Sequence, residues 1–263
     1  MDGLKIARDA RGVVRLTLAR PELRNAFDDG LIARLTETFA ELAGDDAVRC
    51  VVLTGEGKAF SAGADMTWMR RMASYTEEEN AADSRRLAEM MHALDALPHP
   101  TLALVNGPAM GGGVGLVACC DIAIAAEEAF FALSEVRLGL IPAVISPFVV
   151  NAIGVRAARR CFLTGERFDA ELAADFGLVH EVVPLEDLDE AAETVIGALL
   201  ASGPNAVRHS KQLIRDVADE TDRAMLIAET ARRIAALRVS PEGQEGLGAF
   251  LEKRAPAWAP AKD

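Results

Sequence analysis

Two short glycine-rich segments carry residue types that could do chemistry in this sequence. The first is residues 60–65 (FSAGAD) and the second is residues 106–113 (NGPAMGGG). Glycine lets the main chain approach a ligand closely. The second segment precedes an apolar helical stretch, and the first N–H groups of a helix have no partner within it. Two such groups directed at one oxygen would form an oxyanion hole, in which each donor is worth about 2.7–4 kcal/mol to the transition state.

Each glycine-rich segment alone could equally be a packing feature of a strand-to-helix turn. The pattern of a phosphate-binding loop fails, because no Gly-Lys-Ser/Thr follows either segment. The dinucleotide fingerprint GxGxxG is also missing from both. The two segments together, in this order, are therefore more informative than either one.

Glu135 is the candidate acid–base group, because it interrupts the mostly apolar stretch of residues 131–136 (FALSEV). A carboxyl group in such a place is either a paired structural group or a proton carrier. The four histidines form no HxxxH or Cys/His cluster, so the sequence indicates no metal site. No GxSxG motif indicates a serine hydrolase.

The elements that must position these residues alternate between strands and helices. This alternation predicts a mainly parallel sheet with helices outside it. Beyond about residue 203 the pattern predicts only amphipathic helices, three or four of them. The expected strands are residues 13–18, 50–53, 102–105 and 121–126, and the expected helices are residues 28–42, 76–97 and 114–120.

Composition limits the class of protein. The 263 residues are 51% hydrophobic, enough to bury a sizeable core. The net charge of −12 argues against a protein that binds nucleic acid or an anionic membrane. No stretch has the length of a signal peptide or a membrane span, and Asp2 and Asp9 do not fit a mitochondrial transit peptide, so we expect a cytoplasmic protein. Four cysteines in apolar runs are interpreted as reduced core residues: Cys50, Cys119, Cys120 and Cys161.

The chain resembles the enoyl-CoA hydratase/isomerase family, also called the crotonase family. The resemblance rests on residues 58–65 (KAFSAGAD), 106–113 and 119–142, and it continues to residues 242–258 (EGQEGLGAFLEKRAPAW). It implies an α/β fold, a crotonase-type spiral of ββα units. Residues 1–202 would form the core with the acyl-CoA site, and residues 203–263 a C-terminal helical trimerisation region. The expected assembly is a homotrimer or a hexamer built as a dimer of trimers.

The resemblance also implies roles for individual residues. The N–H groups of Ala64 and Gly112 fall on the oxyanion donor positions, and Glu135 falls on a catalytic glutamate position. These three would form an active site that polarises a thioester carbonyl and moves protons.

Coenzyme A would be part of the substrate, and no tightly bound cofactor is expected. By the same resemblance, coenzyme A would run past Lys58, Ala59 and Ala62, and Lys253 near the C-terminus would meet its phosphates.

The sequence departs from the family pattern at Gly115, where hydratases with two glutamates carry the second one. A single glutamate is typical of enoyl-CoA isomerases in the family. However, residues 134–150 (SEVRLGLIPAVISPFVV) resemble the bacterial methylglutaconyl-CoA hydratase branch of leucine degradation. We therefore expect hydration of a branched, carboxylated enoyl-CoA, with an isomerase or a non-catalytic acyl-CoA-binding or RNA-binding protein as alternatives.

Hydration with one glutamate needs a substitute for the missing carboxylate, or a carboxyl group that takes a proton from water and returns it. The substrate's own carboxylate is one candidate substitute, and a dissolved anion such as bicarbonate is another. Arg70, Arg71 and Arg137 are the cations nearest the motifs, and each is interpreted as a surface or ion-pair residue in preference to a clamp for a distal carboxylate.

Overall fold

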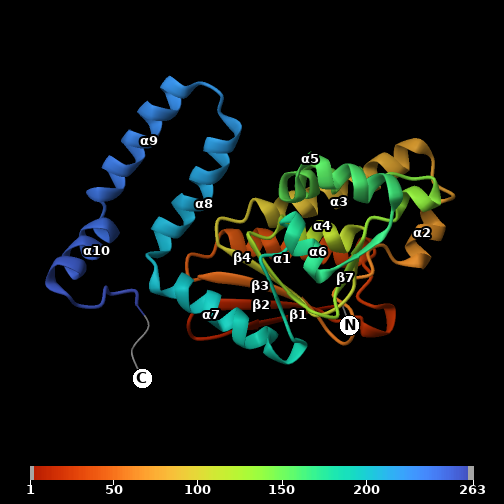
Figure 1. Ribbon diagram of the computed structural model, residues 1–263, viewed down its shortest axis with the longest axis horizontal. Helices are drawn as coiled ribbons and strands as arrows, with labels where there is room; N and C mark the ends of the chain where they lie inside the picture. Colours follow the sequence, from red (N-terminus) through yellow and green to blue (C-terminus); the bar gives the residue numbers. More distant parts are fainter. Residues whose placement is uncertain (1–2, 260–263) are drawn as a thin grey trace.

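The computed structural model describes residues 3–259 and is built around a six-stranded sheet with the order β1-β2-β3-β4-β6-β9 (Figure 1). β1 (Leu4–Arg8) pairs antiparallel with β2 (Val13–Leu18). The remaining neighbours are parallel, which confirms the predicted mainly parallel sheet. They are β3 (Cys50–Gly55), β4 (Thr101–Val105), β6 (Ile122–Ala126) and β9 (Glu181–Val183). The edge strand β1 was not predicted from the sequence.

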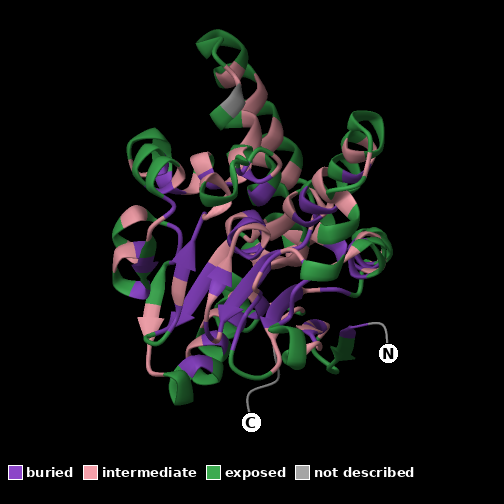
Figure 2. Ribbon diagram, turned by 90° about the vertical axis from the view of Figure 1, so that its right-hand side faces the viewer, coloured by how far each residue is buried: buried purple, intermediate pink, exposed green. Residues whose placement is uncertain are grey.

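Both faces of this sheet are covered by helices, and Figure 2 shows the buried residues concentrated on its strands. Successive side chains of a strand point to opposite faces, so Val51 and Leu53 join one core cluster while Cys50 and Val52 join the other. The second cluster is closed by α7 (Leu188–Ala201). The larger cluster is closed by α1 (Asp29–Ala43), α3 (Glu77–Asp95), α4 (Gly112–Cys119) and α5 (Ser146–Thr164).

Side-chain caps define where the helices near the candidate site begin. Asp28 accepts a hydrogen bond from the N–H of Leu31 and so caps α1. Asp65 caps α2 (Met66–Met72) by accepting from the N–H of Thr67. Each cap satisfies an N–H group that the helix itself cannot pair, and such a cap is typically worth about 1 kcal/mol. The end of the first glycine-rich segment, at Asp65, is therefore fixed by local chemistry.

A second, smaller sheet has the order β5-β7-β8. It is made by β5 (Ala109–Met110), β7 (Phe130–Ala132) and β8 (Arg167–Asp169). The rings of Phe131 and Phe168 stack with their centroids 5.6 Å apart. This sheet carries the second glycine-rich segment and Glu135 at its edge. The remaining short elements are α6 (Ala170–Phe176) and the 3₁₀ turns Pro21–Leu23, Glu135–Leu138 and Leu185–Asp187.

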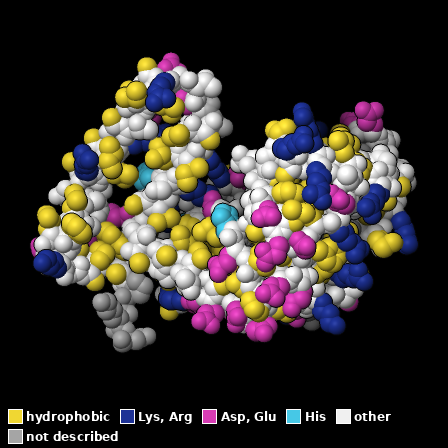
Figure 3. All heavy atoms as spheres, in the orientation of Figure 1, with side chains coloured by type: hydrophobic (Ala, Val, Ile, Leu, Met, Phe, Trp, Pro, Cys, Tyr) yellow, Lys and Arg dark blue, Asp and Glu magenta, His cyan; other side chains and the backbone are white. Residues whose placement is uncertain are grey.

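Three helices after residue 203 extend away from the core as an arm (Figure 1). They are α8 (Pro204–Asp219), α9 (Arg223–Arg238) and α10 (Pro241–Glu252), within the predicted number of C-terminal helices. The arm carries exposed apolar side chains (Figure 3), among them Ile214, Val239, Phe250 and Leu251. Assignment of residues 203–263 to trimerisation stays a prediction, and residues 1–2 and 260–263, with Asp2 among them, lie outside the described part of the chain.

The cysteines and the lengths of the helices bear on two further expectations. All four cysteines are free, and three of them are buried, whereas Cys120 is half-buried. No helix within residues 3–259 has the length and apolar character that crossing a membrane requires.

A buried ion pair attaches α8 to the sheet. The Nζ of Lys211, a side chain only 9% exposed, donates to the carboxylate of Asp121 at 2.6 Å and to the carbonyl oxygen of His99 at 3.1 Å. The same Asp121 oxygen accepts from the N–H and the hydroxyl of Thr101 at the start of β4. Arg215, one turn further along α8, makes a more exposed pair with Asp95.

We predict that Lys211→Ala lowers the free energy of unfolding by about 1–3 kcal/mol, because it removes a charged donor and leaves partly buried acceptors without it. Arg215→Ala on the same helix is the matched control, with an expected loss of about 0–1 kcal/mol because exposed pairs are weak. Urea unfolding of both variants measures the difference. Equal losses would contradict the assignment of Lys211 as the main attachment of the arm.

Candidate active site

Three parallel segments bring the candidate catalytic residues together. Ser61 forms a parallel bridge with Ala109 in β5, and Ala109 in turn pairs with Phe131 in β7. Parallel segments end at the same edge of a sheet, so the residues that follow them meet there. Ala64, Gly112 and Glu135 come shortly after the three segments. The structure therefore gathers residues that are 71 positions apart in the sequence.

The N–H of Ala64 points away from the segment that holds its loop. Ala64 forms a parallel bridge with Phe27, in which the N–H of Phe27 donates to Gly63 O at 2.8 Å and the N–H of Asp65 donates to Phe27 O at 3.0 Å. In this pattern the flanking residues make the bonds, and the polar groups of Ala64 face the other way. Within residues 3–259 its N–H has no hydrogen-bond partner.

The N–H of Gly112 is the other candidate donor, and it is free because Gly112 is the first residue of α4. It too has no partner in the described part of the chain. The two loops touch at Gly63, whose φ of +79° places it in the left-handed region. A Cβ there would lie 2.6 Å from Met110 O and 3.4 Å from Gly112 N. Only glycine allows this approach.

Phe27 packs against both loops, and sequence analysis missed it. Its main chain bridges Ala64, and its ring lies so close to Gly112 that a Cβ there would be 2.3 Å from Cζ. The side chain is 1% exposed. Phe27 thus fixes the spacing between the two candidate donors. An apolar residue carries no chemical signal in a sequence, so nothing in the pattern identifies it.

Asn25 is a second residue that sequence analysis missed. It is fully buried, and its amide nitrogen donates to the carbonyl oxygens of Glu56 at 2.9 Å and Ala59 at 2.7 Å. The main-chain carbonyl oxygen of Asn25 accepts from the hydroxyl of Ser61 at 2.9 Å. Its φ of +56° is a conformation that asparagine tolerates better than most residues. Its residue type, which is common in turns, was the available signal.

Glu135 lies at the edge of the small sheet with its carboxyl group facing the glycine-rich turn. The N–H of Gly111 donates to Ala132 O at 2.8 Å, which holds this turn against β7. A Cβ on Gly111 would lie 3.0 Å from Oε1 of Glu135. Oε2 is buried and has no hydrogen-bond partner among the residues that the structure describes. Burial raises the pKa of this carboxyl group above its ordinary value, because charge is costly away from water.

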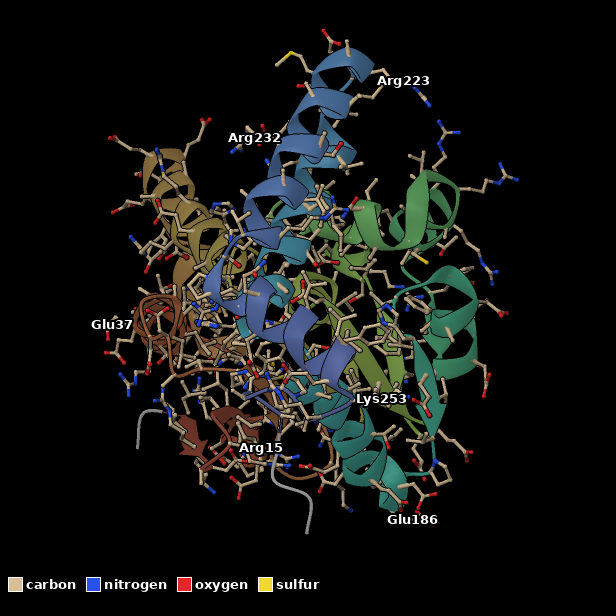
Figure 4. All side chains as sticks on the ribbon, turned by 90° about the vertical axis from the view of Figure 1, so that its left-hand side faces the viewer. Arg15, Glu37, Glu186, Arg223, Arg232 and Lys253 are labelled. Carbon is tan, nitrogen blue, oxygen red and sulfur yellow. The ribbon has the colours of Figure 1, made fainter. Side chains whose placement is uncertain are left out.

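The proposed coenzyme A contacts divide into two groups. Lys58, Ala59 and Ala62 belong to the same loop as Ala64, with Lys58 exposed, Ala62 half-buried and Ala59 buried. Lys253 does not join them within one chain. It ends α10, on the opposite side of the molecule from α2 (Figures 1 and 4). A role for Lys253 at this site would require a second copy of the chain.

Among the three arginines near the motifs, Arg71 is occupied by an ion pair with Asp29. Arg70 and Arg137 are exposed and make no ion pair within the described residues. A groove of about 1180 Å³ lies elsewhere, between the core and α8. None of the candidate catalytic residues lines it, and its walls include His92, Asp121, Phe148, Lys211 and Arg215.

Comparison with known proteins gives the family. The sequence profile described as enoyl-CoA hydratase/isomerase matches residues 8–261. The chain is 36% identical over 243 residues to a putative enoyl-CoA hydratase of Thermus thermophilus, covering 90% of this chain and 94% of that protein. It is 33% identical over 258 residues to the 2,3-dehydroadipyl-CoA hydratase of Escherichia coli, covering 97% and 98%. A solved putative enoyl-CoA hydratase/isomerase (crotonase) from Legionella pneumophila superposes with a TM-score of 0.93 at 46% identity, covering 98% and 99%.

The fold is therefore the crotonase fold, with a ββα core followed by C-terminal helices. The chain belongs to the enoyl-CoA hydratase/isomerase family.

We predict that Gly112→Ala lowers kcat/KM by about 10–10³-fold, because its Cβ must displace either Phe27 or the start of α4 and so misplace one donor. Gly112→Pro would remove the N–H but would add the same clash, so it is the less informative variant. Gly197→Ala in α7 is the control, because no atom lies within 4 Å of the added Cβ. The control should keep full activity and gain about 0.5–1 kcal/mol of stability. Unchanged kinetics of Gly112→Ala would contradict the inference that the contact between Phe27 and Gly112 sets the position of this donor.

We predict that Glu135→Gln keeps the fold and lowers kcat by about 10²–10⁴-fold, the usual range for an acid–base group. In the wild type, kcat/KM should fall on acidification at a pH above the ordinary glutamate range, because the pKa is raised. The folded state then holds its proton more tightly than the unfolded state, so wild-type stability falls as the pH rises through this interval. The Tm of Glu135→Gln should lack that fall. Two parallel Tm-versus-pH curves, or near-normal turnover, would refute the assignment.

Proposed function

We propose that this protein adds water to the double bond of a 2-enoyl-CoA that is branched and carboxylated, such as 3-methylglutaconyl-CoA. One observation carries the proposal: two N–H groups without a partner among residues 3–259 and the half-buried carboxyl group of Glu135 lie together at one edge of the small sheet. The names of the relatives in the comparison support water addition as the reaction. The name of the Escherichia coli relative, 2,3-dehydroadipyl-CoA hydratase, specifies a carboxylated enoyl-CoA.

The chemistry follows from this arrangement. The N–H groups of Ala64 and Gly112 would donate to the thioester oxygen and stabilise the charge that builds there. Glu135 would accept a proton from water as the water oxygen bonds to the β-carbon. The π electrons of the double bond then shift toward the thioester, giving an enolate-like intermediate. Glu135 returns the proton to the α-carbon, so the net change is the addition of one water and the carboxylate is regenerated.

The raised pKa of Glu135 suits both halves of this cycle. A base must be ionised to accept a proton, yet an acid must release it, and a pKa nearer neutrality balances the two demands. Burial supplies the shift. Oε1 faces the glycine-rich turn, where a Cβ on Gly111 would lie 3.0 Å from it, so Oε1 is the oxygen placed to exchange the proton. Coenzyme A would extend along the loop of Lys58, Ala59 and Ala62, as part of the substrate and not as a resident cofactor.

The proposal includes a homo-oligomer, which the exposed apolar surface of the arm supports. Its exposed apolar residues, such as Phe250 at 80% exposure, would be costly to leave in water on an isolated chain. Assembly as a trimer or as a hexamer would cover them, and it would allow Lys253 of one copy to meet the coenzyme A of another. We propose the cytoplasm as the location.

An enoyl-CoA isomerase is the second candidate function, favoured by the single carboxylate. Glu135 could move a proton between the α- and γ-carbons of the acyl chain without using water. A nucleic-acid-binding role is disfavoured by the net charge of −12 and by the acidic side chains gathered over α7 (Figure 3). Retention of Glu135 disfavours a non-catalytic acyl-CoA binder.

The deciding assay compares 3-methylglutaconyl-CoA with crotonyl-CoA, with and without bicarbonate. We predict that kcat/KM is at least about tenfold higher for the carboxylated substrate, equivalent to about 1.4 kcal/mol of transition-state discrimination. The mass of the product should rise by one water, and the ultraviolet absorbance of the conjugated thioester should disappear. A product of unchanged mass with a migrated double bond would establish the isomerase instead. Equal hydration of both substrates would refute the preference for a carboxylated acyl chain.

A further inference from the structure

Gly115 lies one helical turn beyond the residue that faces Glu135. Gly115 is in α4, and its N–H donates to Gly111 O at 3.2 Å. Gly111 is the residue just before α4, and a Cβ there would lie 3.0 Å from Oε1 of Glu135. One turn of helix rises about 5.4 Å, so a long side chain at position 115, such as that of glutamate, could reach toward the candidate site.

The space over Gly115 is filled with hydrocarbon. A Cβ on Gly115 would lie 2.3 Å from Cγ2 and 3.0 Å from Cβ of Ile145, and 3.2 Å from Cε of Met91. Ile145 is 3% exposed and Met91 is fully buried. Carbon atoms that are not bonded pack at about 3.5–4.0 Å, so even one methyl group cannot be added here without a shift.

Ile145 is held firmly in this place. It is the residue before α5, and its carbonyl oxygen accepts from the N–H of Val149 at 3.0 Å. Its side chain is β-branched, which restricts χ1. The methionine can move its flexible end aside, whereas Ile145 cannot rotate its Cγ2 away cheaply. Ile145 is therefore the residue that closes position 115.

We infer that Ile145 is a specificity-determining residue, because it occupies the place where a carboxylate from α4 would otherwise stand beside Glu135. This inference rests on the proposed function. With Ile145 in this place, the reacting carbons would lie between Glu135 and an apolar wall. A dissolved anion bound over Gly115 does not fit this wall. A substrate carboxylate that assists the reaction must therefore come from another direction.

The test is a double-mutant cycle with Gly115→Glu and Ile145→Ala. Gly115→Glu alone should lower Tm by about 5 °C or more, since overpacking is not relieved. Adding Ile145→Ala should restore Tm above the value expected from the sum of the two single changes. The control is Ile153→Ala, which removes the same atoms from a buried isoleucine elsewhere in α5 and opens no space over Gly115. It should give no such recovery.

The second measurement on the same variants is the rate of hydration of crotonyl-CoA. The Gly115→Glu/Ile145→Ala protein should hydrate it at least about tenfold faster than Ile145→Ala, since a second acid–base group commonly contributes about 10²–10⁴-fold. No gain in a variant whose Tm has recovered would overturn Ile145 as a determinant of specificity. Equal recovery of Tm with Ile153→Ala, or a wild-type Tm for Gly115→Glu alone, would overturn the packing argument.

Failure of the proposed function would look different. A wild type that hydrates no enoyl-CoA would refute the hydratase assignment, while the Tm cycle would still decide whether Ile145 closes position 115. Because the Tm cycle needs no turnover, the two failures are distinguishable.

Discussion

The close approach of two main-chain loops is the constraint on which the rest of the structure depends. Neither Gly63 nor Gly112 has room for a side chain, because Met110 O lies over Gly63 and the ring of Phe27 lies over Gly112. This contact exists because Ser61 pairs with Ala109, and because Phe27 holds the first loop through its main chain and the second through its ring. The parallel sheet, its covering helices and their caps serve to bring these short segments to one edge. The stability of the fold and the geometry of the donors are therefore set by the same few contacts.

Electrostatics completes the arrangement at Glu135. A carboxyl group that is partly removed from water and lacks a partner on one oxygen is held at a cost to stability. The surrounding packing tolerates this cost because the residues just before Glu135 are anchored in β7, and Gly111 bonds directly to that strand. The unpaired oxygen is thus a consequence of rigid neighbours and not of local disorder. A partly buried carboxyl group with an unpaired oxygen and a raised pKa is typical of a functional site.

The sequence predicted much of this molecule, and the failures have physical causes. Alternation of strands and helices, an apolar helix directly after the second glycine-rich segment and a helix that begins near Thr76 are local properties, so they follow from local sequence. Phe27 and Ile145 were not predicted, because their importance lies in contacts with residues 85 and 30 positions away. Strand β1 was missed because it is exposed along most of its length and lacks a buried pattern. The expected contact of Lys253 with coenzyme A is not made within one chain, because Lys253 ends α10 on the opposite side of the molecule from α2.

The location of the two candidate donors in the main chain separates two kinds of evolutionary change. Most substitutions around the site alter only its side-chain walls, since an N–H group persists whichever side chain its residue carries. Ile145 is such a wall residue, because it closes position 115 and supplies no donor. A lineage can therefore explore new acyl chains at positions of this kind while the candidate donors stay constant. Gly63 and Gly112 are the exception, because any side chain at these positions would displace a neighbour and move a candidate donor.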